Sequence, residues 1–201
     1  MNDNMECLFS MLLSDNPSLM IRKNEKFIFS IIPELKLCKG FNQNNKWHIY
    51  DVYNHILHVV DGVPKDISLR LSALFHDIGK PFTYTEDKDG VGHFYGHWNK
   101  SNEIFLNFSK LNGLDNNLVE TVSKLIYYHD INIGNMGDKE VSKLIDELNK
   151  DEIEKLFLLK RSDLLAQSPL FHNMINEYEK QKSKILRIKN WSGGNKKQVY
   201  W

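Results

Sequence analysis

The sequence lacks any long run of apolar residues. Its best apolar stretch, residues 27–32, is far shorter than the roughly 18 residues that a membrane span needs, so we expect no transmembrane helix. The N-terminal segment has no basic residues ahead of its apolar stretch, which argues against a secretory signal peptide. Only two cysteines are present, Cys7 and Cys38, and two do not make a disulfide framework. We therefore expect reduced thiols in a cytoplasmic protein that has no membrane partner.

The chain also lacks internal repeats and low-complexity segments. Its 201 residues are enough to bury one sizeable core without disulfides or metals to hold it. Hydrophobic residues make up 41% and charged residues 26%, close to the average of globular proteins. This composition therefore argues against collagen-like, coiled-coil and disordered classes.

Net charge is absent too, because 26 basic residues balance 26 acidic ones. The balance is uneven, since residues 180–201 contain seven basic residues and no acidic one. The rest of the chain keeps 19 basic against 26 acidic residues, a formal charge of −7. Dedicated nucleic-acid binders usually present a basic face, so an acidic body argues against that class. The basic C-terminal end could touch phosphates, but we interpret it as a solvated chain end.

Most of the chain carries apolar residues at helical spacing, which predicts an all-α bundle of about seven to nine helices. Asp66 and Asp115 have the position of helix N-caps, and Asp151 with Glu154 has capping-box spacing. Gly79 and Pro81 are expected to stop the helix that Asp66 starts. The predicted helical segments are residues 6–13, 24–37 (in two pieces), 49–60, 67–78, 97–111, 116–128, 138–148, 151–165 and 170–189. Residues 83–96 surround an Asp-Gly pair and predict a small hairpin or ordered loop.

Four histidines and two aspartates, two of them adjacent, occur at five places spread along the chain. The gaps between them are about 20, 20, 32 and 34 residues, so each group falls on a different helix or helix end. Helical bundles build inward-facing metal sites in this way. Imidazoles combined with carboxylates suit Mn, Fe, Co, Ni or Zn better than Mg. The residues concerned are His55, His76, Asp77, His97, His129 and Asp163.

The segment LRLSALFHDIGKP, residues 69–81, resembles the signature of the HD-domain metal-dependent phosphohydrolase superfamily. Its surroundings are similar to the HD region of bacterial tRNA nucleotidyltransferases (CCA-adding enzymes), over residues 5–170. The matching pieces are PEL (33–35), WHIYDVYNHIL (47–57), DGVGHFYGH (89–97) and SDLLAQ (162–167). The resemblance implies a helical lead-in (1–46), an HD domain (47–190) and a basic tail (191–201). About 46 residues precede Trp47, too few for a nucleotidyltransferase domain, so we expect no nucleotide addition.

The resemblance also implies roles for individual residues. One metal would be held by His55, His76, Asp77 and Asp163, and a second by Asp77, His97 and His129, so one or two divalent metals are expected per chain. Asp77 would bridge the two metals and act in catalysis. Lys80 would neutralise charge on the phosphoryl group, with Arg161 as the second candidate. His48 would lie near the mouth of the substrate site.

The function implied is hydrolysis of a nucleotide-like phosphomonoester or a 2′,3′-cyclic phosphodiester, through a metal-activated hydroxide. An RNA end is a further possible substrate. Three alternatives stay open: another HD hydrolase acting on dNTPs or guanosine tetraphosphate, a non-catalytic RNA-binding module, and a di-iron oxygenase. Simpler roles also stay open for single residues. His97 can cap a helix, His129 can favour a helix dipole, Lys80 can be solvated, Arg161 can pair with Asp130, and Asp51 can either orient His55 or cap its helix.

Overall fold

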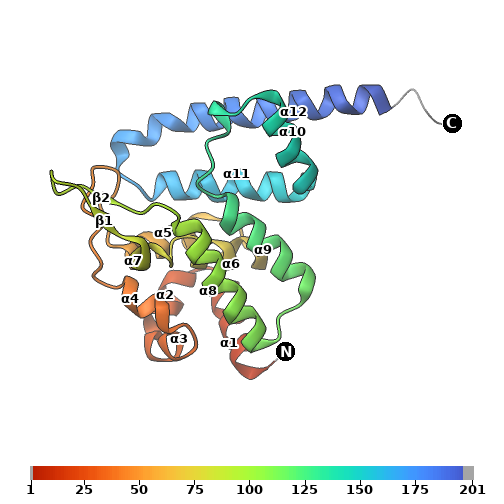
Figure 1. Ribbon diagram of the computed structural model, residues 1–201. Helices are drawn as coiled ribbons and strands as arrows, with labels where there is room; N and C mark the ends of the chain where they lie inside the picture. The colour runs from red at the N-terminus through yellow and green to blue at the C-terminus, as the bar shows by residue number, and fades with distance from the viewer. Residues whose placement is uncertain (1, 197–201) are drawn as a thin grey trace.

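The computed structural model describes residues 2–196, and side chains from residue 2 to residue 188. Most of this range is helical, which confirms the all-α prediction (Figure 1). Two 3₁₀ turns cover Ile133–Asn135 and Pro169–Met174. The α-helices are α1 (Asp3–Leu12), α2 (Pro17–Lys23), α3 (Glu25–Ile31), α4 (Pro33–Cys38), α5 (Val52–Gly62), α6 (Ile67–Phe75), α7 (Lys80–Thr83), α8 (His97–Asn112), α9 (Asn116–Tyr128), α10 (Asp138–Glu147), α11 (Lys150–Leu165) and α12 (Ile175–Lys196).

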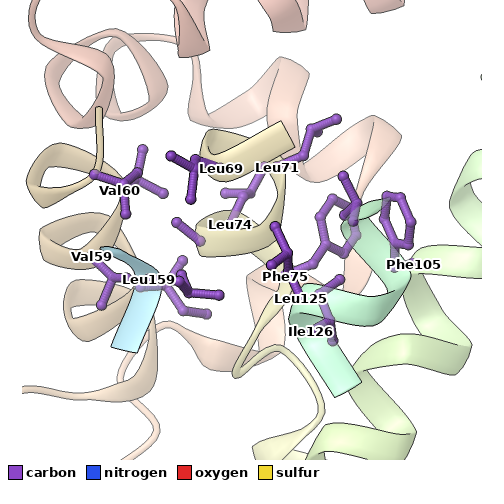
Figure 2. Packing of buried hydrophobic residues seen from close by; sticks show 14 of the residues in the cluster. Val59, Val60, Leu69, Leu71, Leu74, Phe75, Phe105, Leu125, Ile126 and Leu159 are labelled. Carbon is purple, nitrogen blue, oxygen red and sulfur yellow. The ribbon is translucent and has the colours of Figure 1, made fainter. Parts of the chain in front are cut away.

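Helix α6 forms the centre of the core. It packs against α5, the helix that precedes it, and against α9 and α11 from more distant parts of the sequence (Figure 2). Leu71, Leu74 and Phe75 on α6 have no exposed surface. Burial of one such side chain contributes roughly 1.5–3 kcal/mol, so α6 is held firmly along its whole length. Its C-terminal end therefore has a fixed position in the molecule.

The cap signals at two helix starts are confirmed. The Asp66 carboxylate accepts a hydrogen bond from the backbone N–H of Leu69 at 3.0 Å, at the start of α6. The Asp115 carboxylate accepts from the N–H groups of Asn117 and Leu118, at the start of α9. Each cap satisfies backbone donors that the first turn of a helix leaves without a partner. The two caps fix where the central helices begin.

The predicted hairpin is also confirmed. Strand β1 (Thr85–Glu86) pairs antiparallel with β2 (Gly92–His93), with Thr85 opposite His93. Between them, the Asp87 carboxylate accepts hydrogen bonds from two backbone N–H groups, and Gly90 takes a positive φ of 78°. The hairpin leads within four residues to His97, the first residue of α8.

Two expected helix boundaries are wrong. Pro81 does not stop a helix, because α6 ends at Phe75 and Pro81 lies in the first turn of the short helix α7. Proline fits there because the first turn needs no backbone donor. The capping box of α11 uses Asn149 and Glu152 rather than Asp151 and Glu154. Both pairs have the required spacing, and the structure uses the earlier one.

The N-terminal part contains more helices than expected, so the total exceeds seven to nine. Pro17 and Pro33 each lie at the start of a short helix, which divides this part into α1–α4. Its side chains, such as Met5 and Leu8, belong to the same buried cluster as α5 and α6. At the other end, α12 runs alongside α11 and reaches Lys196 (Figure 1). The last five residues of the predicted basic tail, 197–201, lie outside the described residues.

No helix within residues 2–196 combines the length and the apolar character needed to cross a membrane.

Candidate metal centre

The six predicted metal ligands converge on one place from five helices. Most of them sit at helix ends, where neighbouring residues can face the same centre. His55 lies within α5, His76 and Asp77 follow the last residue of α6, His97 begins α8, His129 follows α9, and Asp163 lies within α11. The firmly packed helix α6 thus positions His76 and Asp77 in the middle of the cluster.

Four of the six residues form a first group. The ligand atoms of His55, His76, Asp77 and Asp163 all lie within 4.8 Å of one another. His55 Nε2 is 3.0 Å from Asp163 Oδ1 and 3.2 Å from Asp77 Oδ2. His76 Nε2 is 3.3 Å from the same Asp77 oxygen. Both imidazoles are fully buried, whereas the Asp163 side chain keeps 13% exposure and forms the open edge of the group.

Asp77, His97 and His129 form a second group. Asp77 Oδ1 lies 3.2 Å from His97 Nε2 and 3.6 Å from His129 Nε2. The two Nε2 atoms are 3.1 Å apart. The two oxygens of one carboxylate are therefore divided between the groups, since Oδ2 faces His55 and Oδ1 faces His97. This is the geometry of a carboxylate that bridges two ion sites.

The other ring nitrogen of each histidine contacts a backbone carbonyl. The Nδ1 atoms of His76, His97 and His129 lie 2.7–2.8 Å from the carbonyl oxygen three residues earlier. His55 Nδ1 lies 3.3 Å from the carbonyl oxygen of Ala166. A carbonyl can only accept, so Nδ1 carries a proton in each ring and Nε2 is the nitrogen left to face the centre of the cluster. Histidine ligands of metals are commonly held in this way.

The electrostatics of the groups favour a cation. Burial opposes ionisation of Asp163, but the hydrogen bond to His55 and the charges of His55 and His76 hold its pKa well below the usual range. Burial likewise opposes ionisation of Asp77, but the charges of His76 and Lys80 lower its pKa. Burial alone would lower the pKa of His55, yet its hydrogen bonds to Asp163 and Asp77 raise it to about 9. Two carboxylates thus stay ionised beside the imidazoles, a donor set that fits divalent transition metals, and metal binding would displace the Nε2 proton of His55.

Gly79 allows the turn after Asp77 to close against α8. A Cβ atom at this position would lie 2.6 Å from the backbone oxygen of His97 and 2.6 Å from the backbone nitrogen of Ser101. The Gly79 N–H donates to the Ser101 hydroxyl at 2.9 Å. Contacts this close involve backbone atoms, which cannot yield as a flexible side chain can. The glycine of the HDIGK segment therefore sets the distance between Asp77 and His97.

Lys80 and His48 lie beside the metal groups. The Lys80 ammonium is 2.6 Å from Asp77 Oδ2 and donates to Gln43 Oε1 at 2.8 Å. Its third neighbour is His48 Nε2, at 3.2 Å. Burial and the Lys80 charge lower the pKa of His48 to about 2, and Asn45 accepts from its Nδ1 at 2.8 Å. His48 is thus a neutral acceptor that helps to hold the ammonium in place.

A cavity of about 360 Å³ opens onto these residues. Its walls include the ligands Asp77, His97, His129 and Asp163, together with Lys80, His48 and a set of aromatic residues. One of these, Trp47, stacks against Phe171 with ring centroids 3.6 Å apart. A volume of this size lies at the lower end of small-molecule sites, roughly 300–1,000 Å³.

The structure does not bring Arg161 to this cavity. Its side chain is exposed and lines a separate small hollow with residues of α11 and α12, such as Glu154 and Lys182. Among the described residues it forms no ion pair with Asp130 either. Asp51 acts as the N-cap of α5, since its carboxylate accepts from the N–H of Asn54 at 2.6 Å.

Sequence reasoning missed Lys160 and Gln43. Lys160 is buried in α11, and its ammonium donates to the carbonyl oxygens of His129 and Ile131 at 2.7 and 2.8 Å. Burial lowers its pKa to about 8. Its spacing was a usable signal, because a residue three positions before Asp163 shares the same helix face. Gln43 lies in a loop before α5, where no spacing rule predicts its contact with Lys80.

Comparison with known proteins identifies a family and a relative. Residues 47–189 match the HD domain family. A curated relative, the A-adding tRNA nucleotidyltransferase of Deinococcus radiodurans, is 31% identical over 111 residues. That match spans 51% of this chain and 25% of the relative, so the chain corresponds to only part of that protein.

The fold and the His/Asp cluster therefore define a helical domain of the metal-dependent phosphohydrolase type. This chain belongs to the HD domain family, because the family match covers most of its length. The resemblance found in the HDIGKP segment is confirmed.

Proposed function

We propose that the protein hydrolyses a nucleotide-like phosphomonoester or a 2′,3′-cyclic phosphodiester. The observation that carries this proposal is the divided carboxylate of Asp77, whose two oxygens face two separate histidine groups at the wall of one cavity. Two such sites side by side suit phosphoester hydrolysis, in which attacking and leaving oxygens both need stabilisation. Divalent metals, when bound, would polarise the phosphoryl oxygens and lower the pKa of a water molecule.

The side chains of this chain would hold the metals and stabilise the charge of the substrate. His55, His76 and Asp163 would hold the first metal, His97 and His129 the second, and Asp77 would touch both. Lys80 would stabilise negative charge as it develops on the phosphoryl oxygens, since it is the buried cation of the cavity wall. His48 and Gln43 would keep the Lys80 ammonium aimed at the cavity.

The substrate proposed first is a small nucleotide, and an RNA end is the second candidate. The printed name of the relative, a tRNA nucleotidyltransferase, motivates the RNA end. The negative charge of residues 1–179 favours the small nucleotide instead, because a long RNA would need a basic surface.

A panel of phosphoesters tests the proposal. The protein would be incubated with Mn, Ni, Co or Mg and with phosphomonoesters, 2′,3′-cyclic nucleotides, dNTPs and guanosine tetraphosphate. The expected result is metal-dependent release of product from a monoester or a cyclic nucleotide, absent in an Asp77→Ala variant purified alongside. Metal binding without turnover of any compound would overturn catalysis and favour a binding module.

A further inference from the structure

A second cavity adjoins the metal cavity. It encloses about 340 Å³ and is lined by Trp98, Tyr127, Tyr128, Asp130 and Ile131. Trp98 and Asp130 also line the metal cavity, so the two spaces share a wall. None of the six metal ligands lines the second cavity. It is therefore a separate space that a ligand reaching beyond the metals could enter.

Three residues that line this second cavity are next to metal ligands in the sequence. Trp98 directly follows His97 at the start of α8, and Tyr127 and Tyr128 directly precede His129 at the end of α9. The backbone that positions the second metal group therefore positions these aromatic rings too. A ligand held at the metals would meet them at a fixed place.

The three aromatic residues offer flat faces to a planar ligand. The rings of Tyr127 and Tyr128 stand nearly perpendicular, with centroids 4.9 Å apart and an angle of 88°. The Tyr128 hydroxyl donates to the Glu147 carboxylate, which fixes that ring. Tyr127 keeps 43% exposure, so its ring is accessible. Nucleobases stack on aromatic side chains of this kind, and such stacking tolerates any base.

Asp130 adds a directional polar group to this aromatic space. It is exposed, and within residues 2–188 its carboxylate forms no hydrogen bond or ion pair, although its charge acts to raise the pKa of the buried Lys160. An ionised carboxylate only accepts hydrogen bonds, and it repels phosphate. A nucleotide would therefore place its phosphate at the metals and its base beside Asp130.

Among the common bases, guanine fits this carboxylate best. Guanine presents two adjacent N–H donors on one edge, the ring N1–H and the exocyclic amino group, and a carboxylate can accept both at once. Adenine, cytosine and uracil present a donor beside an acceptor on the same edge, and that acceptor would face the negative charge.

We propose that this second cavity binds the guanine base of a nucleotide whose phosphoester lies at the metal groups. Trp98 and Tyr127 stack on the base, and Asp130 accepts from its N–H edge. The inference rests on the proposed function for the position of the phosphate, but the base site itself can be tested without any phosphate.

Calorimetric binding of nucleosides, which carry no phosphate, is the direct test. Guanosine is expected to bind the metal-loaded protein about tenfold or more tightly than adenosine, as bidentate recognition of one base over another provides. Inosine, which lacks the exocyclic amino group, is expected to fall between them. Equal affinity for guanosine and adenosine would overturn the inference.

Two variants separate the two contacts. Asp130→Asn is expected to remove the preference for guanosine while leaving adenosine binding within a few-fold of wild type. Tyr127→Ala is expected to weaken both nucleosides by similar factors. Asp146→Asn is the matched control, because it makes the same charge change on the exposed surface of α10, away from both cavities. A guanosine preference that survives in Asp130→Asn would contradict the assignment.

The outcomes also distinguish this inference from the proposed function. Hydrolysis of 4-nitrophenyl phosphate requires the metal groups but no base. If the wild type hydrolyses that compound yet shows no preference among nucleosides, the base site is refuted and the phosphohydrolase is not. If guanosine binds selectively but no phosphoester is hydrolysed, the base site is supported and catalysis is refuted.

Discussion

The Nε2 atoms of His97 and His129 lie 3.1 Å apart, although a backbone carbonyl fixes Nδ1 of each ring as the donor. Two imidazole lone pairs thus point at one another across a buried gap, and Asp77 Oδ1 lies beside them. Facing lone pairs repel unless a cation lies between them. The pair is consequently arranged to share a metal ion, and neither histidine is needed for the group around His55.

The number of metals should depend on this pair. Wild-type protein with added Mn is expected to bind two ions per chain, and the His97→Ala/His129→Ala double variant is expected to bind one. The reason is that Asp77 alone cannot hold a second ion against water. Metal content would be measured by elemental analysis after equilibrium dialysis. Equal binding by both proteins at saturating Mn would show a single metal site and give the two histidines another role.

Lys80→Ala should impair catalysis more than metal binding. Removal of a buried cation beside the developing phosphoryl charge is expected to lower kcat on the order of 100-fold, with a smaller change in KM. Both parameters and the metal content would be measured on one preparation. Loss of metal would mean that Lys80 acts chiefly by holding Asp77, which its ammonium contacts at 2.6 Å. An unchanged kcat would remove Lys80 from the mechanism.

Lys160→Met should weaken the second metal site. The substitution keeps the length of the side chain but removes its hydrogen bonds to the carbonyl oxygens of His129 and Ile131. Leaving buried carbonyls without a partner costs about 1–3 kcal/mol, so the turn that presents His129 should loosen. Metal titration is expected to show a lower affinity for the second ion only. Lys155→Met, on the same helix but paired with Asp66 and Asp151, is the control. An unchanged second affinity would rule out this positioning role.

Gly79→Ala should destabilise the fold and separate the metal groups. The new Cβ would lie 2.6 Å from backbone atoms of α8, so the turn or the helix must shift. Overpacking of this kind costs typically about 1–3 kcal/mol, which thermal or urea unfolding can detect. Gly137→Ala is the matched control, because its Cβ would meet only a side-chain oxygen at 3.6 Å. If both variants unfold like the wild type, the contact between the turn and α8 is not constraining.

The candidate site could be predicted from the sequence wherever a short motif carried it. The HDIGKP segment and the order of His55, His97, His129 and Asp163 predicted a cluster that the structure brings together. The caps at Asp66 and Asp115 and the hairpin were predictable because each depends on residues a few positions apart.

The residues whose positions were not predicted from the sequence are placed by rotation about a helix axis or by the path of a loop. Arg161 lies two residues before Asp163, which places it about 200° around α11, away from the cavity. Lys160, three residues before Asp163, shares its face and is buried beside His129. Gln43 reaches Lys80 from a loop whose path depends on tertiary packing rather than on any local pattern.

The most direct measurement concerns Asp77, whose two oxygens face the two metal groups. The kcat of Asp77→Ala and of the isosteric Asp77→Asn would be measured on the best substrate of the panel, with folding verified by circular dichroism and thermal unfolding. Both variants are expected to be folded and to lose essentially all activity. A folded variant that keeps more than about a tenth of wild-type kcat, a change of under roughly 1.4 kcal/mol in the barrier, would contradict the bridging and catalytic role of Asp77.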